Sequence, residues 1–242
     1  PAGTVAETES TAMITHAERE MKLCVWHMDL KPSLTLLDPE ITIGLPATLT
    51  AWTGIDAMVH AIEAYCVPDF HPMCDGVALE ALALIAQWLP RAVEEPDSIM
   101  ARGGMQVGAC LGGVSFLKGL GLVHAISHMV GAEFDTHHGL TNAIVLPTVL
   151  RFNAPAISHK LPAMSRALGL ESADFASFDA AICQMLDRLD IPSSLSDIGV
   201  AVEAAKSIAE KAHQDAAAAT NPREADVETI ERLVIESITR GR

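Results

Sequence analysis

The spacing of hydrophobic residues along the chain changes near position 46. Before that point, short segments rich in apolar or β-branched residues at 11–15, 22–26 and 33–38 are separated by polar connections. This pattern predicts three strands. After it, apolar residues recur at intervals of three and four, which is the period of a helix with one buried face. The sequence therefore predicts a few strands followed by helices.

The helical pattern continues to the end of the chain, with glycine and proline residues between the segments. The predicted helices span 47–66, 74–94, 98–117, 121–131, 138–152, 155–168, 176–189, 200–218 and 224–239. Three short strands are too few to form a stable domain of their own. The sequence thus predicts a mainly α fold, in which a helical bundle at 46–242 follows a strand-containing segment at 1–45.

Composition narrows the possible functions. The chain has 242 residues, 50% of them hydrophobic, and a formal net charge of −15. Such an acidic chain is a poor match for nucleic acid or for an anionic membrane surface. Its apolar runs are interrupted before the roughly 20 residues that a membrane span needs, and the first residues show no signal-peptide pattern. We expect a cytoplasmic protein that binds small molecules and forms homo-oligomers.

Two candidate metal ligands lie in the first predicted helix. Asp56 and His60 are four positions apart, so they share one face and are separated by about one turn. Both interrupt a surface otherwise occupied by residues such as Trp52 and Val59. A carboxylate and an imidazole placed in this way can bind one metal ion. The same spacing also fits an exposed helix pair or a hydrogen-bonded pair in the core.

Further histidines follow in a second apolar segment. His124 and His128 are again four apart, and His137 and His138 come just before a glycine that opens another predicted helix. Burying imidazoles in apolar surroundings is unfavourable unless they have partners, so convergence on a cation would explain them. Three imidazoles and one carboxylate suit Zn²⁺, Fe²⁺ or a similar ion better than Mg²⁺ or Ca²⁺, which prefer oxygen ligands.

These motifs resemble those of a known family, the iron-containing (group III, metal-dependent) alcohol dehydrogenases. The resemblance is carried by "LLDPEITIGLP", "TGIDAMVHAIEAY", "GLGLVHAISHMVGAEFDTHHGLTNAIVLP" and "NPREA", and it covers essentially the whole chain. Its most specific part is the order of an Asp, a His four residues later, and two further His fourteen residues apart, the second followed by Gly.

The resemblance implies a set of site residues. It places the metal ligands at Asp56, His60, His124 and His138. It places His128 beside the substrate and the nicotinamide, where this side chain relays a proton. His137 stands where relatives often have another residue such as Pro, so it is expected to be a neighbour of the site and not a ligand.

The opening residues resemble the family as well. The stretch "AGTVAETESTAMIT" is similar to a loop that touches the cofactor, which implies a cofactor contact at Thr4, and Lys22 matches a basic residue near the dinucleotide. Val5 occupies a position that usually holds Gly or Ala. The family's Rossmann-like α/β domain lies upstream of this loop, and the chain contains no G-x-G-x-x-G motif between a strand and a helix.

We therefore expect the C-terminal part of such an enzyme. Residues 1–45 would be the last strands of a missing Rossmann-like nucleotide-binding domain, and residues 46–242 an all-helical, dehydroquinate synthase-like metal-binding catalytic domain. The implied cofactors are Fe²⁺ or Zn²⁺ and NAD or NADP. The implied reaction interconverts an alcohol and an aldehyde or ketone, with the metal polarising the oxygen of a small alcohol, aldehyde or oxo-acid substrate. This chain alone is expected to be nearly inactive.

Two other readings remain open from the residues. Clustered His and Asp on a helical bundle also occur in metal-dependent phosphohydrolases, although the absence of an adjacent His-Asp pair counts against that class. The second alternative is a non-catalytic remnant whose metal site serves stability or assembly.

Overall fold

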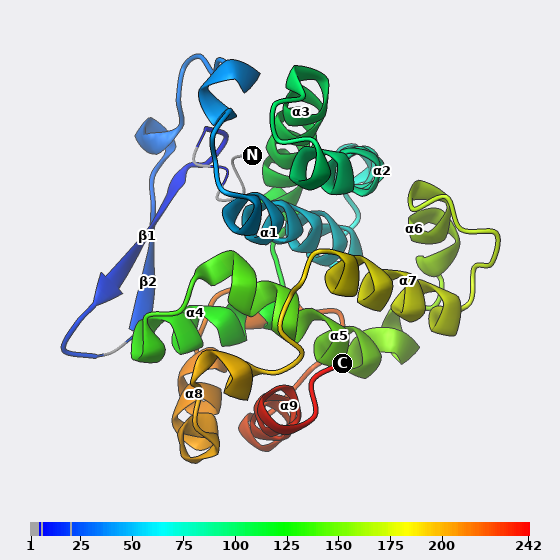
Figure 1. The fold of residues 1–242 in the computed structure, drawn as a ribbon. Helices are drawn as coiled ribbons and strands as arrows, with labels where there is room; N and C mark the ends of the chain where they lie inside the picture. Colours follow the sequence, from blue (N-terminus) through cyan, green and yellow to red (C-terminus); the bar gives the residue numbers. More distant parts are fainter. Residues whose placement is uncertain (1–4, 6, 20) are drawn as a thin grey trace.

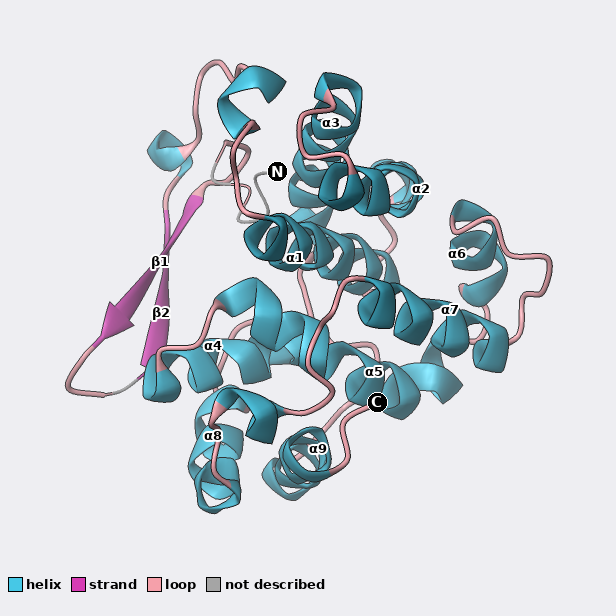
Figure 2. Cartoon of the chain, in the orientation of Figure 1, coloured by secondary structure: helices cyan, strands magenta, loops and turns pink. Residues whose placement is uncertain are grey.

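The computed structural model of the chain describes residues 5, 7–19 and 21–242. Figure 1 shows a mainly helical molecule with a two-stranded hairpin at one side, and Figure 2 shows how little of the chain is strand. The hairpin consists of β1, Thr11–His16, and β2, Met21–Trp26, which pair antiparallel. The helices are α1 (Ala47–Cys66), α2 (Pro72–Glu94), α3 (Ile99–Ser115), α4 (Leu122–Phe134), α5 (His138–Ile157), α6 (Leu161–Ala167), α7 (Phe175–Arg188), α8 (Ala205–Ala212) and α9 (Val227–Thr239). The predicted mainly α fold is confirmed.

Several helices begin at a side chain that accepts a hydrogen bond from the first turn. Ser98 precedes α3, Asp174 precedes α7 and Asp226 precedes α9, and each accepts from the backbone N–H three residues further on. Ser and Asp are favoured at this position because they satisfy an N–H group that has no partner within the helix. The local sequence therefore determines where these helices start.

The third predicted strand is wrong. Residues 33–38 form an irregular connection, and the sheet in the described part of the chain contains only β1 and β2. Leu34 and Leu36 are 76% and 80% exposed. Their alternation resembles that of a strand with one buried face, but neither side chain packs against a core. A strand forms only when it pairs with a neighbouring strand. In the described part of the chain, this segment has no such partner.

Two predicted helix boundaries also differ from the structure. α5 continues through Pro155 to Ile157, so the predicted helix at 155–168 is reduced to α6, Leu161–Ala167. The predicted helix at 200–218 is α-helical only over Ala205–Ala212. Proline removes a helical hydrogen bond and crowds the preceding turn, which favours a helix end before Pro155. The helix nevertheless tolerates this residue in its last turn.

The core is organised around α1. Every residue from 54 to 64 is buried, and a helix that is buried on all sides belongs to the interior of a domain. α1 packs against α2 and α3 on one side and against α5 on the other, while α4 packs against α5 and contacts β2. Polar residues on α1 are therefore buried in the interior of the protein, where they need hydrogen-bond partners from the neighbouring helices.

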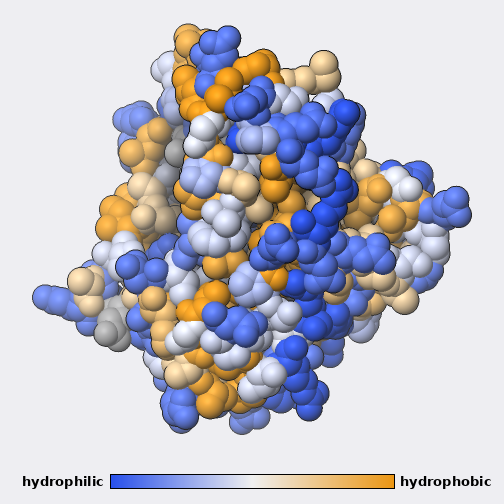
Figure 3. Space-filling model, in the orientation of Figure 1, coloured by the Kyte–Doolittle hydropathy of each residue, from blue (hydrophilic) through white to orange (hydrophobic). Residues whose placement is uncertain are grey.

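Part of the surface is apolar. Figure 3 shows hydrophobic residues in the upper part of the view, over the connection between β2 and α1. Leu34, Leu36 and Ile41 belong to this connection and are exposed. Among the described residues, α2 is long and apolar enough to cross a bilayer by length and composition, but it packs against both α1 and α3. Core helices of globular proteins have the same properties.

The close approach of α5 to α1 predicts a specific sensitivity at Gly139. A Cβ atom at this position would overlap the backbone oxygen of Trp52 and lie 3.1 Å from Cβ of Asp56. We expect Gly139→Ala to lower the free energy of unfolding, measured by urea denaturation, by about 1–3 kcal/mol because the two helices must separate.

Gly76→Ala is the matched control for this substitution. Gly76 also lies in a helix, α2, but a Cβ atom there meets nothing within 4 Å. This change should leave the stability unchanged or raise it by about 0.4–1 kcal/mol, because the unfolded chain loses conformational freedom. Equal effects of the two substitutions would show that α1 and α5 are not in close contact at Gly139.

Candidate metal centre

The four predicted metal ligands meet in the interior of the molecule. α1 carries Asp56 and His60, α4 carries His124, and His138 is the first residue of α5. The Nε2 atoms of His60, His124 and His138 lie 3.7, 3.7 and 3.6 Å from a single atom, Oδ1 of Asp56. Residues separated by up to 82 positions in the sequence thus direct four ligand atoms toward one point.

These distances fit a metal ion. With bonds of about 2.0–2.2 Å, a tetrahedral ion spaces its ligand atoms by about 3.3–3.6 Å. Ligand atoms of Asp56, His60 and His124 also lie within 4.8 Å of one another, and His138 joins this group through its distance to Asp56. The nitrogen-rich ligand set suits a first-row divalent ion such as Zn²⁺ or Fe²⁺. The residues present therefore fit the group that the sequence resemblance implies.

Three of the four predicted ligands are almost fully buried. The side chains of Asp56, His60 and His124 are 2–5% exposed, whereas that of His138 is 21% exposed. His138 is therefore the most exposed of the four side chains. An enclosed site also strengthens electrostatic interactions, because little water screens the charges.

The ionisation of the four side chains follows from their burial and their proximity. Burial alone would raise the pKa of Asp56, but the nearby histidines outweigh it and hold this pKa well below its usual range. Burial lowers the pKa of His60 to about 4 and moves the pKa of His138 well below its usual value. Burial also acts to lower the pKa of His124, but hydrogen bonds to Asp56 and Glu63 outweigh it and raise the pKa to about 9. A cation would therefore displace a proton from His124 on binding.

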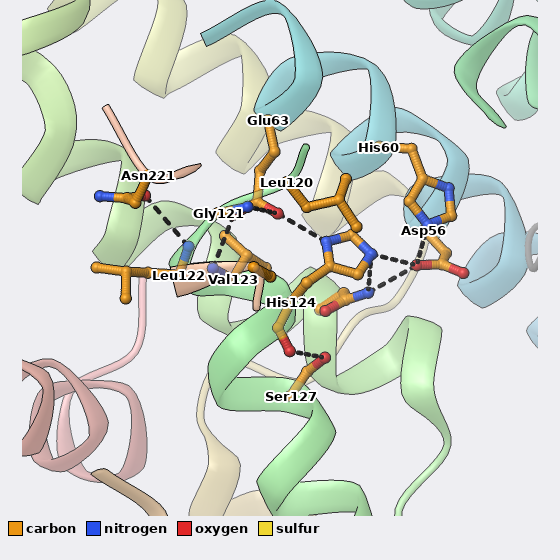
Figure 4. A network of polar contacts seen from close by, with 12 residues as sticks. Asp56, His60, Glu63, Leu120, Gly121, Leu122, Val123, His124, Ser127 and Asn221 are labelled. Carbon is orange, nitrogen blue, oxygen red and sulfur yellow. Dashed lines mark hydrogen bonds and ion pairs between the residues drawn. The ribbon is translucent and has the colours of Figure 1, made fainter. Parts of the chain in front are cut away.

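Glu63 is a site residue that the sequence analysis missed. Its Oε2 atom lies 2.7 Å from Nδ1 of His124 and accepts a hydrogen bond from the backbone N–H of Gly121, and its Oε1 accepts one from Val123. Figure 4 shows this carboxylate between α1 and the start of α4. The signal was present in the sequence, because Glu63 follows His60 by three positions and thus lies on the same face of α1.

Asn142 is a second missed residue. Its Nδ2 atom donates a 2.6 Å hydrogen bond to Oδ1 of Asp56 and lies 3.3 and 3.1 Å from Nε2 of His124 and His138. It follows His138 by four positions on α5. Asn142 thus links α5 to the Asp56 carboxylate on α1. The helical spacing from His138 was the signal that could have identified it.

His128, the predicted proton relay, lies beside the ligand cluster and has a carboxylate partner. Its Nδ1 is 2.9 Å from Oδ2 of Asp215, and its ring stacks on that of His138 with the centroids 5.3 Å apart. The backbone N–H of Ala217 donates to the other oxygen of Asp215. Asp215 lies between α8 and α9, 87 positions from His128, so no local pattern in the sequence could connect the two.

The remaining candidate residues have different surroundings. Lys22 of β2 lies against Gly131 of α4; burial lowers the pKa of its ammonium, and the attraction of Asp56 partly opposes this. Nδ1 of His137 accepts a hydrogen bond from the N–H of Leu140 and so caps α5. Thr4 lies outside the described residues.

Val5 adopts a backbone conformation that is unusual for a β-branched residue. Its φ angle is 51°, in the left-handed region that favours glycine. Its side chain is fully buried, and a Cβ atom added to Gly113 of α3 would lie 2.7 Å from Cβ of Val5. Val5 therefore packs directly against α3.

Comparison with known proteins identifies relatives of this chain. The NAD-dependent methanol dehydrogenase of Bacillus methanolicus is 36% identical over 240 residues, which are 96% of this chain and 63% of that protein. The 1,3-propanediol dehydrogenase of Klebsiella pneumoniae is 35% identical over 236 residues, 95% of this chain and 61% of that protein. The chain thus spans less than two thirds of the length of these relatives.

Solved structures show the same relationship. A crystal structure of 1,3-propanediol oxidoreductase superposes with a TM-score of 0.93 at 34% identity, covering 98% of this chain and 64% of the other. An alcohol dehydrogenase from Oenococcus oeni gives a TM-score of 0.90 at 32% identity, covering 96% of this chain and 63% of the other. A family model described as "Fe-containing alcohol dehydrogenase family, C-terminal" matches residues 50–238, which include all four predicted ligands. This chain belongs to the Fe-containing alcohol dehydrogenase family.

Proposed function

We propose that the chain is the metal-binding part of an NAD(P)-linked alcohol dehydrogenase. In this reaction an alcohol loses a hydride to NAD(P)⁺ and a proton to a base, giving an aldehyde or ketone, and the reverse reaction reduces the carbonyl compound. The observation that carries the proposal is the convergence of three imidazole Nε2 atoms on one carboxylate oxygen of Asp56. Relatives named as dehydrogenases of methanol and 1,3-propanediol support the reaction class.

In this proposal Asp56, His60, His124 and His138 hold one Fe²⁺ or Zn²⁺ ion. When bound, the ion supplies a Lewis acid for the substrate oxygen, and the nicotinamide supplies the hydride acceptor or donor. Asn142 donates to the Asp56 carboxylate and thereby fixes its orientation. His138 is the most exposed of the four side chains, so in this proposal the substrate oxygen approaches from its side.

His128 is placed to carry the proton. Asp215 accepts a hydrogen bond from Nδ1 of His128, which leaves Nε2 of this ring as the atom that accepts or donates a proton. The ring stacks on His138, the most exposed of the four proposed ligands. A positioned imidazole is an effective general acid–base group.

The cofactor contacts are part of the same proposal. Lys22 carries a half-buried ammonium group beside Gly131 of α4, and its charge would attract a phosphate or carboxylate group of the dinucleotide or the substrate. Thr4 and His128 would make further contacts with the cofactor. We propose small alcohols, aldehydes or oxo acids as substrates, a homo-oligomeric cytoplasmic enzyme, and residues 1–45 as part of the nucleotide-binding domain. Neither nucleic acid nor a membrane is a proposed partner.

Metal content tests the proposed site directly. The 242-residue chain, incubated with Zn²⁺ or with Fe²⁺ under anaerobic conditions and then desalted, should retain about one ion per chain. His124→Ala should lose that ion, because the substitution removes an imidazole that is buried between Asp56 and Glu63. Elemental analysis of both proteins provides the measurement.

His159→Ala is the matched control, because His159 is exposed and lies outside the cluster. It should retain the metal content of the parent chain. If the parent and both variants bind the same amount of metal, the ion is elsewhere and the proposed function loses its basis.

Substitution of His128 separates proton transfer from metal binding. His128→Ala should keep the metal content of the parent chain, since the ring lies beside the ligand cluster and its Nδ1 is bound to Asp215. In a longer protein that joins this chain to a nucleotide-binding domain, the same substitution should lower the turnover of NAD(P)-linked alcohol oxidation by a factor of about 10²–10⁴, the usual contribution of a general acid–base group. Loss of metal would instead identify His128 as a ligand.

A further inference from the structure

We propose that Glu63 is a positioning residue of the metal centre, which fixes the tautomer and ring orientation of His124 and supplies the second buried negative charge that balances a divalent ion. The inference rests on the proposed metal site but concerns a residue outside the ligand set.

The hydrogen bonds of Glu63 define the state of His124. An ionised carboxylate can only accept hydrogen bonds, so the 2.7 Å contact between Oε2 of Glu63 and Nδ1 of His124 places the proton on Nδ1. Nε2, 3.7 Å from Oδ1 of Asp56, is then the ring nitrogen left to coordinate a cation once its own proton is displaced. Figure 4 shows the imidazole of His124 held between the two carboxylates. Only this tautomer can coordinate a cation through Nε2 while it donates to Glu63.

The start of α4 holds the carboxylate in place. The backbone N–H groups of Gly121 and Val123 donate to the two oxygens of Glu63 at 3.0 and 2.8 Å. The positive end of a helix dipole stabilises an anion at this position. Gly121 permits the contact, because a Cβ atom there would lie 2.7 Å from Oε1 of Glu63. The carboxylate therefore cannot turn away from His124 without breaking two buried hydrogen bonds.

Charge balance gives Glu63 a second effect. A divalent ion bound by Asp56 and three neutral imidazoles leaves one net positive charge in a site whose ligands are almost wholly buried. An unbalanced charge in the interior is strongly unfavourable. Glu63, which is 6% exposed, supplies a negative charge that offsets it directly beside the ligand His124. Removing a carboxylate that orients a ligating imidazole typically weakens metal binding by about 10–100-fold.

Glu63 also caps a helix, and Asn221 provides a control for that role. Oδ1 of Asn221 accepts a hydrogen bond from the N–H of Leu122, in the same turn of α4, and the other side-chain hydrogen bonds of Asn221 go to Asn153 and Arg223. Asn221→Ala therefore removes a cap from the same helix start without changing the partner of the ligand.

The experiment compares Co²⁺ binding by the parent chain, Glu63→Gln, Glu63→Asp and Asn221→Ala. The dissociation constant is measured by competition with a chelator, and the d–d absorption bands of the bound ion report its coordination geometry. Glu63→Gln should bind about 10–100-fold more weakly and show altered bands, because an amide cannot accept from all three N–H groups. Glu63→Asp keeps the charge and should recover part of the affinity. Asn221→Ala should lose stability but keep the affinity and the spectrum of the parent.

Two results would overturn the inference while leaving the proposed function intact. One is parent-like affinity and spectrum in Glu63→Gln. The other is that Asn221→Ala weakens Co²⁺ binding as much as Glu63→Gln does. That result would show that Glu63 acts only as a helix cap. A parent chain that binds no Co²⁺ would overturn both the inference and the proposed function.

A measurement on the parent chain covers the case in which Glu63→Gln does not fold. In the Zn²⁺-loaded protein labelled with ¹⁵N-histidine, NMR should show His124 protonated at Nδ1, with the resonance identified by its absence in His124→Ala. An unprotonated Nδ1 on His124 would overturn the inference.

Discussion

The buried carboxylate on the central helix needs polar partners, and the surrounding helices must supply them. Asp56 lies on α1, which is enclosed by α2, α3 and α5, and an isolated charge in such a place is strongly unfavourable. Three imidazoles and one amide converge on a single oxygen of this side chain. They come from α1, α4 and α5, so the packing of these three helices and the geometry of the site depend on each other.

The position of α4 determines where two histidine rings of the site lie. It carries both His124 and His128, and each ring is bound through Nδ1 to a carboxylate from another part of the chain. Glu63 comes from α1, and Asp215 from the connection between α8 and α9. The two rings therefore present Nε2 to the interior of the site in a defined orientation. A shift of α4 would change the metal ligand and the proposed proton carrier together.

The sequence predicted the parts of this arrangement that depend on local spacing. Asp56 with His60, and His124 with His128, are four residues apart, and helical geometry alone puts each pair on one face. Glu63 and Asn142 follow the same rule but were missed, because a single polar residue on a helix gives a weak signal. Asp215 was beyond prediction, since its partner lies 87 positions away. The alternation of Leu34 and Leu36 indicated a strand, but whether a strand forms depends on a pairing partner that the local pattern does not specify.

The central claim is that one divalent ion is held by Asp56, His60, His124 and His138. The most direct test is anomalous X-ray scattering from crystals of this chain grown with Zn²⁺ or Fe²⁺. The account predicts one peak among these four side chains, with bonds of about 2.0–2.2 Å to Oδ1 of Asp56 and to the three Nε2 atoms. A fully loaded crystal with its peak at another place, or with no peak between these residues, would contradict it.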